Sequence, residues 1–184
     1  MIRLSFDAAA LNAKLADLGS RMAAAARPAA QAGAQVLYEE VRSNVDRIGV
    51  VSGNLRRAVY QAYATHDSSP EPGGRKAYHI SWNWRKAPHG QLLEYGYLQR
   101  YVVFYRGGRW ITAVRPSMRG KPRPKRRAPQ AVKDAYYVTL PGGPRHVAAR
   151  PFLRPAAAAM PRALDAARAV FRRQLSGSHR ISGS

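Results

Sequence analysis

Residues 148–159 read Ala-Ala-Arg-Pro-Phe-Leu-Arg-Pro-Ala-Ala-Ala-Ala, and this stretch decides where the chain changes direction. Pro151 biases Arg150 towards an extended backbone, because the proline ring crowds the residue before it. Pro155 suits the first turn of a helix, where its missing N–H is not needed. We therefore predict a strand that ends here and a helix that begins here.

Two bulky apolar residues, Phe152 and Leu153, lie between Arg150 and Arg154 in this stretch. Large apolar side chains are usually buried, whereas arginines stay at a surface unless they are paired. We predict a corner in which Phe152 and Leu153 enter a core, while both arginines point to solvent or to a partner.

A C-terminal helix is predicted after this corner, from about Pro155 to Arg173, and Pro161 must kink or restart it. One face of this helix is basic and the other carries a narrow apolar stripe. The stripe consists of Leu164, Ala167, Val170, Phe171 and Leu175. Residues 176–184 are chiefly Ser, Gly, His and Arg, so we expect a flexible tail.

Helices are also predicted at the N-terminus, after an alternating segment at residues 1–6 and a helix cap at Asp7. Apolar residues then recur at spacings of three and four, which is typical of a helix. These residues are Leu11, Leu15, Leu18 and Met22. We expect Arg27-Pro28 to interrupt this helix, and a second helix to run from Pro28 to about Val45.

The helices give way to strands after a break at Gly53, where Ser52 can cap a short turn that contains Leu55. Residues 59–64 and 77–85 both alternate between two faces, which predicts an antiparallel hairpin. One face of the second strand carries aromatic and apolar residues, namely Tyr78, Ile80, Trp82 and Trp84. We favour packing of this face against a helix over stacking on nucleotide bases.

The central region predicts further short elements. Residues 87–95 predict a helical turn closed by Gly96, with Leu92 and Leu93 inward and Glu94 paired with an arginine. The remaining elements are a hairpin of residues 101–105 and 110–114 around Gly107-Gly108, a strand at 136–140 and a turn at 141–144. We predict an α+β fold, with N-terminal helices, an antiparallel sheet and a C-terminal helix packed on that sheet.

Residues 115–127 differ from the rest of the chain, with seven basic residues, three prolines and no acid. Such a segment cannot form a helix or an interior strand. Dense positive charge without acids indicates contact with a polyanion or an acidic partner. The basic residues are Arg115, Arg119, Lys121, Arg123, Lys125, Arg126 and Arg127.

The composition supports a partner-dependent protein. The chain of 184 residues carries 31 Lys and Arg against 10 Asp and Glu, a formal net charge of +21, and no cysteine. We expect one domain over residues 1–175. No stretch approaches ~18 apolar residues and no signal peptide is evident, so we expect no membrane contact and a role in a cytoplasm or in a particle assembled there.

Signatures of conventional enzymes are absent from the sequence. No glycine-rich phosphate loop or nucleophile elbow is present, and the five histidines show no metal-ligand spacing. We therefore predict that the protein is not an enzyme and needs no cofactor or metal. No pattern for reading bases is present either.

Three motifs in order resemble the neck and tail-completion proteins of long-tailed bacteriophages. They are Ser52-Gly53-Asn54-Leu55-Arg56, Leu93-Glu94-Tyr95-Gly96, and residues 150–156, Arg-Pro-Phe-Leu-Arg-Pro-Ala. The third motif is the most specific of the three. The resemblance covers most of the chain except residues 99–147, which we interpret as an insertion that carries the basic segment.

This resemblance implies a non-enzymatic ring subunit of the virion, expected to be hexameric and assembled in the bacterial cytoplasm. Its implied partners are the head–tail connector, a tail terminator or the tail tube, and packaged double-stranded DNA. Which neck ring it forms, and whether the basic segment meets DNA or an acidic protein, stay open. A free sequence-nonspecific nucleic-acid-binding protein is the alternative, and a small enzyme or toxin acting on nucleic acid is the third hypothesis.

Overall fold

The computed structural model describes residues 8–49 and 53–176. It is 53% helical and 17% strand, which confirms the predicted α+β class. The chain divides into two compact units, Met1–Ala87 with Phe152–Ser184, and Pro88–Pro151. The expectation of one domain stays a prediction. The predictions for Ser52, Asp7, the segment 1–6 and the tail beyond residue 176 concern residues outside the described part of the chain.

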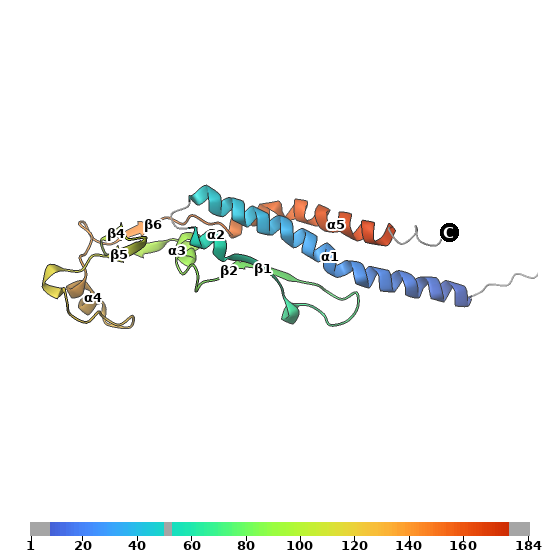
Figure 1. Cartoon of the computed structure of the whole chain (residues 1–184), viewed down its shortest axis with the longest axis horizontal. Coiled ribbons are helices and arrows are strands. Elements are labelled where there is room, and N and C mark those ends of the chain that lie inside the picture. Colours follow the sequence, from blue (N-terminus) through green and yellow to red (C-terminus); the bar gives the residue numbers. More distant parts are fainter. Residues whose placement is uncertain (1–7, 50–52, 177–184) are drawn as a thin grey trace, which may run out of the picture. The chain divides into compact units, whose positions relative to one another are not determined.

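The first unit begins with α1, Ala8–Ile48, a single helix of 41 residues that contains Pro28 (Figure 1). The predicted interruption at Pro28 is therefore wrong. A proline inside a helix costs about 3 kcal/mol, because it removes one hydrogen bond and crowds the preceding turn. Ala25 and Ala29 are buried on either side of Pro28, and this packing keeps the helix continuous.

The C-terminal helix α5, Met160–Ser176, packs against α1 and not on a sheet as predicted (Figure 1). The approach is close at Gly33, where an added Cβ would lie 3.0 Å from the carbonyl oxygen of Ala163. Ala163 and Ala167 form this contact, as expected where two helices pack closely. Of the predicted stripe, Leu164 is exposed, so the prediction is wrong for that residue. The other four members, Ala167, Val170, Phe171 and Leu175, are half-buried.

A β-hairpin packs on α1 in the same unit. Strand β1, Val59–Tyr63, pairs antiparallel with β2, Tyr78–Trp82, and Val59 lies opposite Trp82. The hairpin prediction is confirmed. The Tyr78 hydroxyl donates a 3.5 Å hydrogen bond to the side chain of Gln31 on α1, and the Trp82 ring packs against Phe152. Trp84 lies beyond the end of β2 and is 66% exposed, so its predicted place on the strand face is wrong.

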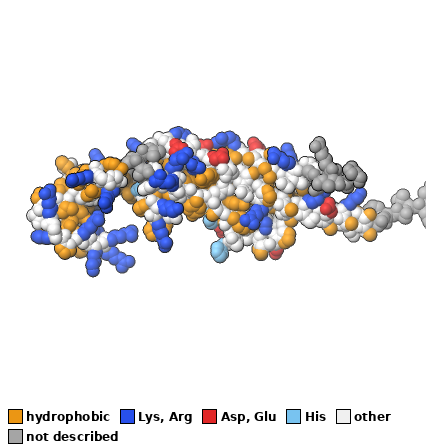
Figure 2. Space-filling view, viewed as in Figure 1, with side chains coloured by type: hydrophobic (Ala, Val, Ile, Leu, Met, Phe, Trp, Pro, Cys, Tyr) orange, Lys and Arg blue, Asp and Glu red, His pale blue; other side chains and the backbone are white. Residues whose placement is uncertain are grey.

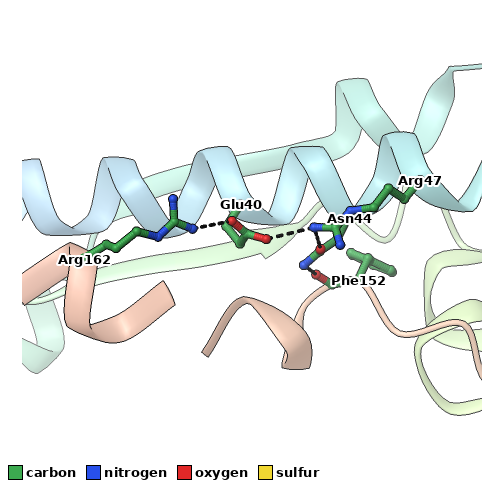
Figure 3. A network of polar contacts seen from close by, with 5 residues as sticks. All are labelled: Glu40, Asn44, Arg47, Phe152 and Arg162. Atoms are coloured by element: carbon green, nitrogen blue, oxygen red, sulfur yellow. Dashed lines mark hydrogen bonds and ion pairs between the residues drawn. The ribbon is translucent and has the colours of Figure 1, made fainter. Parts of the chain in front are cut away.

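Phe152 lies in the core of this unit, as predicted. Its side chain is completely buried, and its ring meets Trp82 edge to face at a centroid distance of 5.3 Å. The Asn44 amide donates a 2.9 Å hydrogen bond to the Phe152 carbonyl oxygen (Figure 3). Asn44 also accepts from Arg47, while Glu40 pairs with Arg47 and Arg162.

The chain leaves this corner through a short helical segment before α5. The segment η3, Arg154–Ala159, is a 3-10 helix, and the α-helix begins only at Met160. Pro161 thus restarts the helix, which was one of the two predicted outcomes. Leu153 is half-buried, and Arg150 and Arg154 are exposed as predicted.

A short helix, α2 at Asn54–Ala58, connects α1 to the hairpin. Gly53 precedes it with a φ of 69°, in the left-handed region that favours glycine. Leu55 is buried within α2. A 3-10 turn, η1 at Thr65–Asp67, lies between β1 and β2.

The second unit contains two small antiparallel sheets. Strand β3, Tyr97–Gln99, pairs with β6, Arg145–Val147, and β4, Val103–Arg106, pairs with β5, Arg109–Thr112. The described strands thus form three two-stranded sheets, and the prediction of one antiparallel sheet is wrong. The hairpin turn at Gly107-Gly108 is confirmed, since both glycines have positive φ.

A helix in the second unit replaces a predicted strand. Helix α4, Gln130–Tyr136, ends where the strand at 136–140 was expected, and only isolated bridges follow at Tyr137 and Thr139. Helix α3, Gly90–Tyr95, ends at Gly96 as predicted. In α3 the inward orientation predicted for Leu92 is wrong, since Leu92 is 45% exposed, whereas Leu93 is half-buried. Glu94 is buried, and its pairing with an arginine stays a prediction.

Candidate partner-binding segment

The basic segment, residues 115–127, lies within the second unit between β5 and α4. It begins with a 3-10 turn, η2 at Pro116–Met118, and continues without regular helix or strand to residue 129. The prediction that it forms neither a helix nor an interior strand is confirmed apart from this single turn. Its three prolines and absence of acids account for this conformation.

Helix α4 holds the backbone of the basic segment in place. The Tyr136 hydroxyl donates a 3.0 Å hydrogen bond to the Lys121 carbonyl oxygen, and the Lys133 ammonium donates at 2.8 Å to that of Arg126. A backbone turn joins the Ala128 N–H to the Lys125 carbonyl oxygen at 2.9 Å. The segment is therefore anchored at several points along its length.

Two of the seven predicted basic residues have structural roles. The Arg115 guanidinium donates to the carbonyl oxygens of Asp134 and Tyr137, both at 3.1 Å. Arg123 donates to the Tyr137 hydroxyl at 2.7 Å and stacks over the Tyr137 ring, 5.9 Å from its centroid. Both arginines fasten the segment to the end of α4, so they are poorly placed to bind a partner.

The other five basic residues are exposed and form no ion pair among the residues that the structure describes. They are Arg119, Lys121, Lys125, Arg126 and Arg127. Figure 2 shows Lys and Arg side chains gathered on the loop beside α4. We call these five residues the free cations. Their positions leave them available to an anionic surface.

No exposed acid neutralises this charge within the second unit. Pro88–Pro151 contains thirteen Lys and Arg residues against two acids, Glu94 and Asp134. Glu94 is buried, and the Asp134 carboxylate accepts hydrogen bonds from Tyr101 at 2.8 Å and Gln130 at 2.7 Å. The unit therefore presents a positive potential that attracts polyanions.

The Asp134 cluster also makes this anchor sensitive to pH. Hydrogen bonds from Tyr101 and then Gln130 lower the pKa of Asp134 below its ordinary value of 3.8. Desolvation, followed by the hydrogen bond to Asp134, raises the pKa of Tyr101 above its ordinary value of 10.0. The ionised carboxylate and the neutral phenol are thus the forms that the folded chain favours.

We expect the Tyr101→Phe substitution to flatten the pH dependence of unfolding at both extremes. The stabilisation from Asp134 is present above pH 3.8 and is lost as the pH falls through its lowered pKa. The stabilisation from Tyr101 is present below pH 10.0 and is lost as the pH rises through its raised pKa. Melting temperatures across both ranges measure this effect.

Tyr105→Phe is the matched control for this substitution, since it removes an exposed hydroxyl from the same unit. It should leave the pH dependence of the melting temperature as in the wild type. Equal pH profiles for the Tyr101→Phe variant and the wild type would show that the cluster does not contribute.

The predicted corner residues have structural roles and lie in different units. Gly53, Leu55 and the residues Phe152, Leu153, Arg154 and Pro155 belong to the first unit. Glu94, Gly96, Arg150 and Pro151 belong to the second, where the Arg150 N–H donates to the Leu93 carbonyl oxygen at 2.7 Å. Gly96 has a φ of 74°, and an added Cβ would lie 2.7 Å from the Val147 carbonyl oxygen. Glycine is required there by conformation and by space.

The sequence interpretation missed the residues that organise the basic segment. Lys133, Tyr136 and Tyr137 hold it, and they lie on or just after α4. The available signal was the helix-forming Gln130, Ala131, Lys133 and Ala135, whose helix propensity outweighs the strand preference of the tyrosines that follow.

In the described part of the chain, no group of three or more His, Asp or Glu side chains is placed to hold a metal ion. No helix in the same residues is long and apolar enough to cross a membrane.

No protein-family model, curated protein or solved structure matches this chain.

Proposed function

We propose that this chain is a structural, non-enzymatic subunit of the neck of a long-tailed bacteriophage. It would form a ring, expected to be hexameric, between the head connector and the tail terminator or tail tube, around the path of the DNA. The free cations carry this proposal, because they are held in position by α4 and lack neutralising acids. The resemblance of the three sequence motifs supplies the assignment to the neck.

Duplex DNA fits the free cations because every sequence presents the same phosphates to a channel. Contacts to phosphates bind and orient without reading bases. A ring would repeat the five cations in every subunit, so that individually weak contacts add up. An acidic neighbouring ring would offer the same complementary charge.

An apolar seam on α1 supports assembly with further copies of the chain. Leu11, Leu15, Leu18 and Met22 follow one another at spacings of four, three and four, and each is between 43% and 56% exposed. The Arg21 guanidinium donates to the Leu175 carbonyl oxygen near the end of α5. The N-terminal turns of α1 continue past this point without α5 beside them (Figure 1). We call these four residues the α1 seam.

Packing of the α1 seam on a second copy would remove four large apolar side chains from water. Each of these side chains is already about half buried within one chain, so its burial at an interface contributes about 1 kcal/mol, and the contact would recur at every interface of a ring. The spacing of the seam also matches the alternate three- and four-residue steps of helices that pack along their length.

We expect the triple substitution Lys125→Gln, Arg126→Gln and Arg127→Gln to weaken binding of duplex DNA without unfolding the chain. The slope of log affinity against log salt should fall by about 0.9 for each cation that contacts a phosphate. These side chains are exposed, so the melting temperature should stay close to that of the wild type. Fluorescence anisotropy with a labelled duplex at several salt concentrations measures the slope.

The matched control replaces Arg168, Arg172 and Arg173 of α5 by glutamine. These arginines are exposed, and their removal lowers the net charge by the same amount. The control should keep a larger salt slope than the first variant. A slope for the Lys125, Arg126 and Arg127 variant equal to that of the wild type would rule out a DNA contact by these cations and leave an acidic ring as their partner.

A further inference from the structure

A second feature of the basic unit is a hairpin that exposes aromatic side chains. Tyr105 and Trp110 lie opposite each other on β4 and β5, and their rings meet edge to face at 5.4 Å. Trp110 is 64% exposed and Tyr105 is 45% exposed. Both side chains keep this exposure in the folded unit, so packing in a core does not explain them.

The tip of the same hairpin carries two arginines that face each other. Arg106 and Arg109 are the cross-strand pair next to Tyr105 and Trp110, so they lie on the opposite face of the two-stranded sheet, at its tip. Both are exposed, and neither forms an ion pair among the described residues. Like charges directly opposite on neighbouring strands are destabilising. An anion at the tip would relieve this repulsion, so the pair favours an anionic ligand.

We propose that the β4–β5 hairpin binds single-stranded nucleic acid, with bases stacked on the face of Trp110 and Tyr105 and with the backbone passing around the tip to reach Arg106 and Arg109. Single strands combine a flat π face and a negative charge in every nucleotide, which matches aromatic and basic residues on one short hairpin. Duplex DNA offers the charge but keeps its bases stacked inside the helix. A duplex would therefore leave the aromatic face in water.

This binding site is distinct from the basic segment and does not depend on assembly into a ring. The free cations would bind any polyanion, whereas the hairpin would bind preferentially to unpaired bases. Thr112 ends β5 and the basic segment begins at residue 115, so a strand bound to the hairpin could continue onto the cations. The hairpin would add a preference for single strands to an otherwise nonspecific surface.

The test uses the full chain, a fluorescent oligothymidylate and a blunt duplex of the same length. For Trp110→Ala we expect about tenfold or greater loss of affinity for the single strand and less than twofold change for the duplex. Trp110→Phe retains an aromatic ring and should keep most of the single-strand affinity. In the wild type, the single strand should also quench tryptophan fluorescence, and this quenching should diminish in the alanine variant.

Trp84→Ala is the control, because Trp84 is equally exposed and lies in the other unit. It should bind both nucleic acids as the wild type does. Unchanged single-strand affinity in Trp110→Ala would overturn the proposal. An equal loss of affinity for single strand and duplex would also overturn it, because such a loss would indicate an effect on charge or folding. A change in the oligomer mass of the variant would overturn it as well and would assign the hairpin to a protein contact.

Discussion

Replacing Phe152 with alanine should lower the free energy of unfolding by about 3–5 kcal/mol, the largest stability effect that we expect from one substitution. The side chain is completely buried and its ring contacts Trp82, so truncation removes apolar contacts and leaves a cavity beside the indole. The hydrogen bond from Asn44 goes to the backbone of residue 152 and does not depend on this side chain. Urea unfolding followed by circular dichroism measures the loss.

Leu164→Ala provides the matched control for this substitution. Leu164 lies on α5 and is 49% exposed, so its truncation should change the free energy of unfolding by about 0.5 kcal/mol or less. If Phe152→Ala lowered the free energy of unfolding by less than about 1 kcal/mol, Phe152 would not be a main core residue of this unit.

The double substitution Leu15→Gln and Leu18→Gln should prevent assembly of the proposed ring and leave a monomer of 20.3 kDa. Both leucines belong to the α1 seam and are exposed within one chain, so their loss should cost assembly and not folding. Glutamine keeps a high helix propensity but cannot replace the buried apolar surface. Light scattering gives the mass, and circular dichroism verifies the helix content.

Ala13→Gln with Ala16→Gln is the control for the seam. These exposed residues lie on the opposite side of α1 and should keep the mass of the wild type. If the seam variant retained the wild-type mass, another surface would have to hold the copies together.

Local sequence signals predicted several elements because the decisive interactions are close in the chain. The alternation at residues 78–82 and the glycine pair at the β4–β5 turn both determine local backbone geometry. Phe152 was predicted to be buried because it is the bulkiest apolar residue between two arginines. The basic segment was recognised from composition, since seven cations without an acid cannot be folded into a core.

Other features depend on partners far away in the sequence. Pro28 stays inside α1 because residues on both sides of it are buried, which no local rule for proline includes. Tyr97 pairs with Val147, so the separation of the strands into small sheets could not be read from any one strand. Hydropathy alone would leave Glu94 exposed, yet the fold buries it and exposes Leu92.

The candidate site was only partly predictable for a similar reason. All seven cations were named, but their division into two structural arginines and five free cations depends on Tyr137 and Asp134. Both residues lie beyond the basic segment, and their contacts appear only once α4 has formed. The exposure of Trp110 likewise depends on which elements pack nearby.

The mass of the purified full chain by light scattering, at moderate and high salt and without nucleic acid, tests the proposed ring most directly. We expect a mass several times 20.3 kDa that persists at high salt, because the α1 seam is apolar and salt strengthens apolar contacts. A mass near six times that value would agree with a hexamer. A monomer at both salt concentrations that binds duplex DNA and releases it as salt rises would contradict a preassembled ring and favour a free nucleic-acid-binding protein.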